Sequence, residues 1–562
     1  MINRFRGALY ASLFFCGSAF ATEPLVGLAW TTSQELTEIA NLRGSVRYVA
    51  RGIVFVTAQE QNVGGFEVLC IDQAAVGDRY FIADHLSLPL PAGVELVFNG
   101  GGEWVLLRVP EGRLGSLYGA PHFLWPLPDN YSINGWLGNS ERAPKALQTV
   151  SPAVASLIAG ADAARLQADV EALALKDPAL GSVEGNIRSR FAVHPEFLES
   201  TEYIQSQLSA ALGAEAVELH PFSIGAQRVV SYASRRGNQA AAPVDTMTHN
   251  VIGTLAGTDP GAGYYIICAH YDATGVRSAG GWAWDSDPAP GADDNASGVA
   301  LVLESARLLA GQRFPWSIRF IAWSGEELGL LGSQAYADIA ADRDDNILGV
   351  LNFDMIGFNN LMQRLELVTN PGSRWLVDEM SAVAERYSIE LAVDVLEDGG
   401  ARLSDHAPFW ARGYDGILGI ENYLPTDATT YGVAEGKYQV NSQYHSVVDV
   451  PDSINWALVR STTQLAVATL AQYGLGEGQP NLAVFTGDLR GDRNDDLRVR
   501  VSNIGLGTVA AGFRVRVSHC AADSSGCEVI YDADDSEELV PGSGVDSSIP
   551  WQRFGEMVFL IE

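Results

Sequence analysis

Short runs of continuous apolar residues alternate with longer segments that repeat apolar residues every three to four positions. The short runs predict strands that are buried on both faces, and the longer segments predict helices. The predicted strands are 263–272, 316–325, 347–357, 365–369 and 416–422, and the predicted helices are 161–175, 195–212, 297–311, 326–340, 373–388 and 454–473. This alternation predicts an α/β fold with a mainly parallel mixed sheet and helices on both faces. In such sheets, ligands bind beyond the carboxyl ends of the strands.

The regions on either side of this alternating core have a different pattern. Residues 22–148 contain short apolar runs broken by Gly, Pro and Asn, which predict a β-rich N-terminal propeptide or accessory domain. After a linker at 476–480, residues 480–562 alternate in the manner of a β-sandwich-like accessory domain. Since 562 residues are too many for one simple core, we expect a separate central domain at 149–476.

The first 21 residues have the features of a secretory signal peptide. Arg4 and Arg6 give a positive start, 7–20 is a short apolar stretch, and 19–21 reads Ala-Phe-Ala, a small-x-small cleavage sequence. The apolar stretch is too short to span a bilayer, and no later segment is a transmembrane candidate. We therefore expect an exported protein, periplasmic or extracellular, whose mature chain begins near Thr22.

The chain is strongly acidic, with a formal net charge of −32. Such a surface repels nucleic acid and anionic membranes, so neither is expected as a partner. Cys520 and Cys527 enclose a short polar loop and could form a disulfide in an oxidising compartment. Cys268 lies in an apolar run and is expected to be a buried thiol. No sequence feature sets the oligomeric state.

Histidines and acidic residues lie at the ends of the predicted strands and in the loops beside them. They are His270, Asp293, Asp294, Glu326, Glu327, Asp354 and His445. Two imidazoles and at least three carboxylates are the donors that two zinc ions sharing one carboxylate need. Three carboxylates and one hydroxide also balance the charge of two Zn²⁺, so that such a site can be buried without a large desolvation cost.

Residues from about 185 to 475 resemble the secreted co-catalytic dizinc aminopeptidases, the family of bacterial leucyl aminopeptidases. The resemblance rests on an ordered set of motifs: NVIGTLAG, CAHYD, PGADDNASGVA, SGEELGLLGS, NFDMIG, SDHAPF and YHS. It implies a zinc exopeptidase fold and two Zn²⁺ per chain. Carried over by motif, His270 and Asp354 would bind one zinc ion. Glu327 and His445 would bind the other, and Asp294 would bridge the two.

The same resemblance implies how the remaining motif residues act. Glu326 would be the general base, because an adjacent pair of acids leaves a strand end in different directions and only Glu327 is needed as a ligand. Asp272 would orient the imidazole of His270. The family also has a cis peptide bond just after the bridging acid, here between Asp294 and Asn295.

The implied activity is removal of N-terminal residues from peptides or proteins by a hydroxide that bridges the two zinc ions. Met355 follows the implied ligand Asp354, and Tyr444 precedes the implied ligand His445. Both residues are therefore positioned to line a pocket for the first side chain. Such a pocket suggests a preference for an apolar first residue.

Several residues also have structural interpretations that involve neither metal binding nor catalysis. An isolated pair of acids is usually a solvated turn or a helix N-terminus. Asp293 is expected to be structural, His406 a loop or pocket residue, and Asp449 a helix N-terminal acid rather than a ligand. The sequence has neither an HExxH helix nor a GxSxG turn, which argues against single-zinc peptidases and serine hydrolases.

Three alternatives remain. Glutaminyl cyclases use a related site, usually with one zinc and an altered bridging motif, whereas GADDNASG and the five implied ligands are intact here. Glutamate-releasing carboxypeptidases have a similar core but need basic residues for a substrate carboxylate, and no such cluster is evident. A metal-free binding protein would not need the complete set of ligands.

Overall fold

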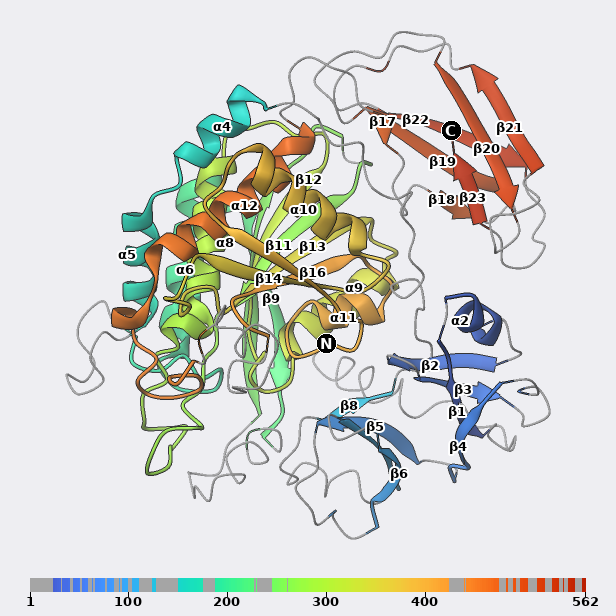
Figure 1. The fold of residues 1–562 in the computed structure, drawn as a ribbon. Helices are drawn as coiled ribbons and strands as arrows, with labels where there is room; N and C mark the ends of the chain where they lie inside the picture. Colours follow the sequence, from blue (N-terminus) through green and yellow to red (C-terminus); the bar gives the residue numbers. More distant parts are fainter. Residues whose placement is uncertain are drawn as a thin grey trace, which may run out of the picture.

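The computed structural model describes residues 150–174, 187–226, 229, 245–259, 261–423, 439 and 441–474, and shorter segments between 24 and 127 and between 482 and 561. The expected signal peptide, the expected linker and Cys527 of the expected disulfide lie outside these residues. The described elements form three groups, which are N-terminal strands, a large α/β core and C-terminal strands (Figure 1). No helix in the described part of the chain is long and apolar enough to cross a membrane.

An eight-stranded mixed sheet forms the centre of the core. Its strands are β9 (Val217–Ile224), β10 (Thr246–Leu255), β11 (Tyr264–His270), β12 (Ser317–Trp323), β13 (Ile347–Asp354), β14 (Arg364–Thr369), β15 (Ala392–Glu397) and β16 (Gly416–Ile420). The strand order is β15-β14-β16-β13-β11-β12-β10-β9. The four central strands β12, β11, β13 and β16 are parallel, whereas β10 pairs antiparallel with β12 and β14 with β16. The predicted mixed sheet with a parallel centre is therefore confirmed.

Helices cover both faces of this sheet, as predicted. On one face lie α4 (Pro152–Ala159), α5 (Ala163–Leu173), α6 (Phe197–Leu212), α8 (Gly298–Leu309), α10 (Arg374–Arg386) and α12 (Trp456–Gly474). On the other lie α9 (Leu331–Asp342) and α11 (Ala407–Ala411). Alternate side chains of β11 are buried on opposite faces of the sheet. Tyr265 and Ile267 belong to the larger apolar cluster, and Ile266 and Cys268 belong to the smaller one. Cys268 is a buried free thiol, which confirms that prediction.

Helix α9 begins later than predicted. The sequence pattern placed its start at Glu326, but residues 326–330 form turns and the helix begins at Leu331. Gly325, Gly329 and Leu330 have positive φ angles, which a right-handed helix does not accommodate. The turns leave both glutamates in a short loop after β12.

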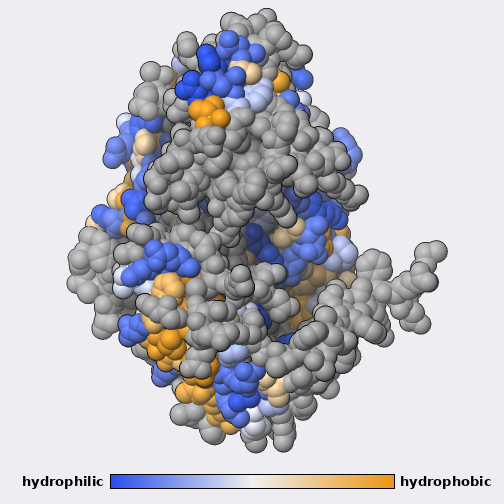
Figure 2. Space-filling view, turned by 90° about the vertical axis from the view of Figure 1, so that its right-hand side faces the viewer, coloured by the Kyte–Doolittle hydropathy of each residue, from blue (hydrophilic) through white to orange (hydrophobic). Residues whose placement is uncertain are grey.

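The N-terminal elements form two antiparallel four-stranded sheets, in agreement with the predicted β-rich unit. They are β1 (Leu25–Ala29), β2 (Gly44–Ala50), β3 (Ile53–Ala58), β4 (Val68–Asp72), β5 (Arg79–Asp84), β6 (Glu95–Asn99), β7 (Trp104–Val109) and β8 (Leu124–Pro126), with helix α2 (Ser33–Ala40). Figure 2 shows hydrophobic residues gathered on the lower part of one face of the molecule. Exposed apolar side chains on these strands are Val68, Ile71 and Leu96.

The C-terminal strands are also antiparallel. They are β17 (Leu482–Ala483), β18 (Leu489–Gly491), β19 (Asp496–Asn503), β20 (Arg514–Cys520), β21 (Glu528–Asp534), β22 (Gly544–Pro550) and β23 (Val558–Ile561). Two separate sheets of this kind fit the predicted β-sandwich-like unit. The proposed boundaries at residues 149 and 476 stay predictions.

Candidate metal centre

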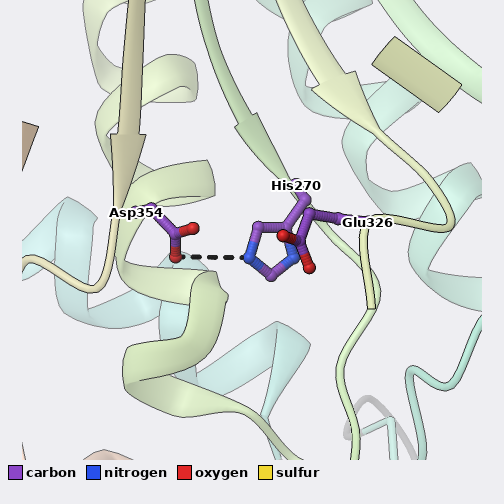
Figure 3. Close-up of side chains that lie close together, drawn as sticks. All are labelled: His270, Glu326 and Asp354. Carbon is purple, nitrogen blue, oxygen red and sulfur yellow. Dashed lines mark hydrogen bonds and ion pairs between the residues drawn. The ribbon is translucent and has the colours of Figure 1, made fainter. Parts of the chain in front are cut away.

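The sequence-predicted donors meet at the carboxyl edge of the central strands. His270 is the last residue of β11, Asp354 is the last residue of β13, and Glu326 follows β12. These strands are neighbours and parallel, so their ends lie together. Figure 3 shows the three side chains converging from their separate strand ends, with Asp354 facing the imidazole of His270.

The first half of the site is centred on His270. Its Nε2 atom lies 3.3 Å from Oδ1 of Asp354 and 3.2 Å from Oδ1 of Asp294. The carboxylate of Glu326 is also near, since one donor atom each from His270, Glu326 and Asp354 lies within 4.8 Å of the others. Three carboxylates, those of Asp354, Asp294 and Glu326, therefore lie near His270.

The second half of the site is centred on His445, in the loop that precedes α12. Its Nε2 atom lies 3.0 Å from Oδ2 of Asp294 and 3.1 Å from Oε2 of Glu327. Asp294, from the short helix η6 (Ala292–Ser297) before α8, thus presents one carboxylate oxygen to each histidine. This is the geometry of a carboxylate that can bridge two cations. The Asp294–Asn295 peptide bond is cis, as the resemblance implied.

The donors fit two zinc ions. Oε1 of Glu327 is buried and has no hydrogen-bond donor. A buried carboxylate oxygen without a donor is costly, and a cation would satisfy this atom. Imidazole nitrogens and carboxylate oxygens are also the ligands that zinc takes in catalytic sites.

The electrostatics of the site likewise favour bound cations. Burial alone would lower the pKa of His445, but Glu327 and Asp294 outweigh it and raise that pKa to about 9. Burial also lowers the pKa of His270, and Asp354 and Glu326 more than reverse this, so the pKa lies well above its usual value. The carboxylates that attract a proton to each imidazole would attract a metal ion in the same way.

Burial makes both glutamates resist ionisation. Burial raises the pKa of Glu327 to about 7, although His445 opposes the shift. Burial also raises the pKa of Glu326 well above its usual value, against the opposing effect of His270. Asp294 behaves in the opposite way. Burial raises its pKa, but hydrogen bonds from His270 and His445 more than reverse this and hold the pKa well below its usual value.

Two buried carboxylates hold the backbone of the two acidic pairs. Asp272 accepts hydrogen bonds from the backbone N–H groups of Glu326 and Glu327, at 3.1 and 3.2 Å. Asp449 does the same for Asp293 and Asp294, at 2.9 and 3.0 Å. Each pair is thus fixed by an acid from a distant segment of the chain.

The expected role of Asp272 beside His270 stays a prediction, and the structure gives the contacts of both its carboxylate and its backbone oxygen. Its carboxylate lies 3.8 Å from Nδ1 of His270, and the hydrogen-bond partner of that nitrogen is the backbone oxygen of Asp272, at 3.0 Å. The carboxylate oxygens face the two glutamate amides instead. Asp449 is not a member of either donor group, and its bonds to the amides at the start of η6 were not predicted from the sequence.

Further residues behind the donors were also missed by sequence reasoning. The buried guanidinium of Arg190 donates to the backbone oxygens of Tyr271 and Gly291, on either side of the site. Ser404 donates to Oδ2 of Asp354, at 2.7 Å, and accepts from Asn352. The SDHAPF motif was a signal for Ser404, whereas nothing in the sequence marked Arg190.

The side chains expected near the substrate lie beside the donors. Met355 belongs to a buried apolar cluster against which Tyr444 packs, and the ring of Tyr444 stacks on that of His445 with 3.7 Å between centroids. His406 is buried and bonds to the backbone oxygen of Ala401, so it is outside the donor groups, as expected. Asp293 accepts from the backbone of Gly357, which agrees with a structural role.

Comparison with known proteins agrees with this arrangement. The model of Peptidase family M28 matches residues 250–470. A protein of Leptosphaeria maculans named probable zinc metalloprotease is 36% identical over 304 residues, which are 49% of this chain and 67% of that protein. Aminopeptidase YwaD of Bacillus subtilis is 31% identical over 202 residues, 35% of this chain and 41% of that protein.

A solved structure gives a more distant likeness. The LapA aminopeptidase of Legionella pneumophila is 16% identical, with a TM-score of 0.46 over 70% of this chain and 98% of that one. The chain spans less than half the length of several curated relatives, for example 47% of a Pyrenophora tritici-repentis protein named probable zinc metalloprotease. The match of the family model and the extent of the Leptosphaeria maculans match show that this chain belongs to peptidase family M28.

Proposed function

We propose that the chain is a dizinc aminopeptidase that releases N-terminal residues from peptides. The observation that carries the proposal is the placement of Asp294, whose two carboxylate oxygens face two separate histidine–carboxylate groups. A single-metal site would not need a buried carboxylate shared between both halves. Family membership supports a metallopeptidase, and the name of the Bacillus subtilis relative supports the aminopeptidase assignment.

The donors divide into two sets with one shared member. His270 and Asp354 would hold one ion, Glu327 and His445 would hold the other, and Asp294 would bridge them. Bound zinc supplies a coordinated water of lowered pKa and polarises a carbonyl oxygen. Three carboxylates nearly neutralise two divalent ions, which allows the centre to be buried.

Glu326 is the fourth carboxylate of the site, and we assign it the proton transfer. Asp294 already supplies the third donor beside His270, so Glu326 is not required as a ligand. Glu326 is also less buried than Glu327. It would take a proton from the attacking water and return it to the leaving amine.

The surrounding residues would position the peptide. The acidic cluster attracts a protonated amino terminus and disfavours an N-blocked substrate. The apolar cluster around Met355 and Tyr444 would receive the first side chain, which favours an apolar first residue. We also propose export, because the predicted signal peptide precedes the core.

The test compares substrates that differ only at the amino terminus. We expect release of nitroaniline from leucine p-nitroanilide but not from its N-acetyl derivative, and loss of this activity when a chelator removes the metal. Metal analysis should find two zinc ions per chain. Cleavage of the N-acetyl compound alone, or full activity with at most one bound zinc, would contradict the proposal.

The glutaminyl cyclase alternative is tested with a peptide that begins with glutamine. Loss of ammonia and formation of a pyroglutamyl end, without release of the first residue, would support the cyclase. Release of free glutamine supports the aminopeptidase.

A further inference from the structure

An arginine lies one aromatic ring away from the candidate metal centre. The guanidinium carbon of Arg277 lies over the ring of Tyr444, 4.8 Å from its centroid. The ring of His445 stacks on Tyr444 with 3.7 Å between centroids, so the guanidinium must cover the other face of the tyrosine. The three side chains therefore form a stack that leads from a candidate zinc ligand outward to a cation.

Two hydrogen bonds hold the loops that carry this stack. The N–H of Arg277 donates to the backbone oxygen of His445 at 2.8 Å. The next residue, Ser278, accepts a hydrogen bond from the backbone N–H of Val447 at 3.0 Å. The loop that carries Arg277 is thus attached to the loop that carries His445, at the histidine itself and two residues after it.

The guanidinium of Arg277 is available for a ligand. The side chain is exposed, and no carboxylate in the described part of the chain pairs with it. Some other arginines of the core pair with carboxylates, such as Arg307 with Asp169 and Arg412 with Asp338.

We propose that Arg277 binds a carboxylate of the residue that follows the scissile bond. This inference rests on the proposed function and specifies its substrate class, which is dipeptides or peptides with an acidic second residue. The carboxylates of the metal centre repel a second negative group, and Arg277 is the cation stacked beside them. Guanidinium and carboxylate form charge-assisted and often bidentate hydrogen bonds, so one arginine is sufficient.

The proposed contact needs a negative charge close to the scissile bond. One residue of extended peptide spans about 3.5 Å, so a dipeptide has its C-terminal carboxylate one residue beyond the scissile carbonyl. A longer neutral peptide would pass Arg277 without an ionic contact.

The test compares Leu-Gly with Leu-Gly-amide, which differ only in the carboxylate. We expect kcat/KM of the zinc-loaded protein to be about tenfold higher for the free acid, equivalent to one charge-assisted bond. Arg277→Gln should bring this ratio close to one, mainly through KM, and Arg277→Lys should retain part of it. The preference should also fall at high salt, because the partner is exposed to solvent. Arg343→Gln is the matched control, since this exposed arginine precedes β13 at the opposite edge of the sheet.

A second pair of substrates identifies the source of the carboxylate. Preference for Leu-Glu-amide over Leu-Gln-amide assigns Arg277 to an acidic side chain, and preference restricted to Leu-Gly assigns it to the C-terminus. Calorimetry with Glu326→Gln measures the affinity of the same ligands without turnover and should show the same dependence on Arg277.

The outcomes separate this inference from the proposed function. If leucine p-nitroanilide and both dipeptides remain intact, the aminopeptidase proposal fails. If the amide and the free acid are cleaved equally well, and Arg277→Gln leaves their ratio unchanged, the role of Arg277 is wrong while the aminopeptidase stands. Arg277-dependent cleavage of N-acetyl-Leu-Glu would instead show a carboxypeptidase and contradict both.

Discussion

The two glutamates that follow β12 are adjacent in sequence but have different surroundings. Glu327 is buried, and its Oε2 lies 3.1 Å from Nε2 of His445. Glu326 is partly exposed and lies with His270 and Asp354. A carboxylate needed as a ligand and a carboxylate needed for proton transfer should therefore respond differently to substitution.

Replacement of each glutamate by alanine tests this assignment. Glu326→Ala should keep the zinc content and KM, and should lower kcat by about 10²–10⁴-fold, the usual contribution of a positioned acid or base. Glu327→Ala should lose zinc, because it removes an anionic donor from one ion. Zinc analysis and steady-state kinetics on both variants decide the matter. Loss of zinc from Glu326→Ala alone would reverse the two roles.

A buried glutamate outside the site makes stability depend on pH. Burial raises the pKa of Glu366 from its usual value of 4.5 to about 7. The folded state therefore holds this proton more tightly than the unfolded state, and the stability gained at low pH is lost as pH rises from about 4.5 to 7. Glu366→Gln, which can still accept from the backbone N–H of Tyr423, should remove this loss, worth about 3 kcal/mol at pH 8.

Thermal unfolding of the metal-free protein and this variant at pH 5 and pH 8 gives the measurement. The variant should gain stability relative to the parent chain only at the higher pH. Equal differences at both pH values would show that Glu366 is already ionised in the folded state.

At the scale of single residues, the sequence predicted the metal donors but not the residues that hold the backbone around them. His270, Asp294, Glu326, Glu327, Asp354 and His445 lie in motifs whose residue types already indicate metal chemistry, and the structure brings all of them together. Asp449 and Arg190 act through backbone groups far away in the sequence. Such contacts depend on how the loops pack, which residue type and spacing do not record.

At the scale of elements, each acidic pair is held by a carboxylate from another loop. Asp449 accepts hydrogen bonds from the backbone N–H groups of Asp293 and Asp294. These bonds fix the backbone of η6 and therefore the direction of the Asp294 side chain. Asp449→Asn would turn one acceptor oxygen into a donor and leave a buried amide unpaired, at a cost of about 1–3 kcal/mol. We expect the affinity for zinc to fall by about 10–100-fold, as for other groups that orient a ligand.

Competition with a chelator measures that affinity. Asp452→Asn is the control, because Asp452 is exposed and three residues away. If both variants bind zinc as the parent chain does, Asp449 is dispensable for the orientation of Asp294.

The accuracy of the element predictions follows from the environment of each element. The central strands β11, β12 and β13 are buried on both faces, and their continuous apolar runs made them evident. Strand β9, at the edge of the sheet, is largely half-buried or exposed and has no such run. The late start of α9 depends on left-handed backbone at Gly325 and Gly329, which apolar periodicity does not reveal.

At the scale of the whole molecule, the N-terminal strands contact the core close to the site. The guanidinium of Arg402 lies 3.8 Å from the centroid of the Tyr48 ring and donates to the backbone oxygen of Val49 on β2. Burial lowers the pKa of Arg402 to about 9. Ala401, next to Arg402, packs in the same apolar cluster as Met355. The N-terminal unit is therefore connected to the proposed substrate pocket through one loop.

This connection predicts that the N-terminal unit restrains the enzyme. A chain that begins at Val150 should show a higher kcat/KM for leucine p-nitroanilide than one that begins at Thr22, because the loop at 401–403 is released. Arg402→Ala should raise activity in the longer chain and have no effect in the shorter one, since its partners Tyr48 and Val49 are then absent. Circular dichroism and thermal unfolding establish that the shorter chain is folded. Equal activity of the two folded chains would rule out an inhibitory propeptide, and an effect of Arg402→Ala in both would assign the arginine to the core alone.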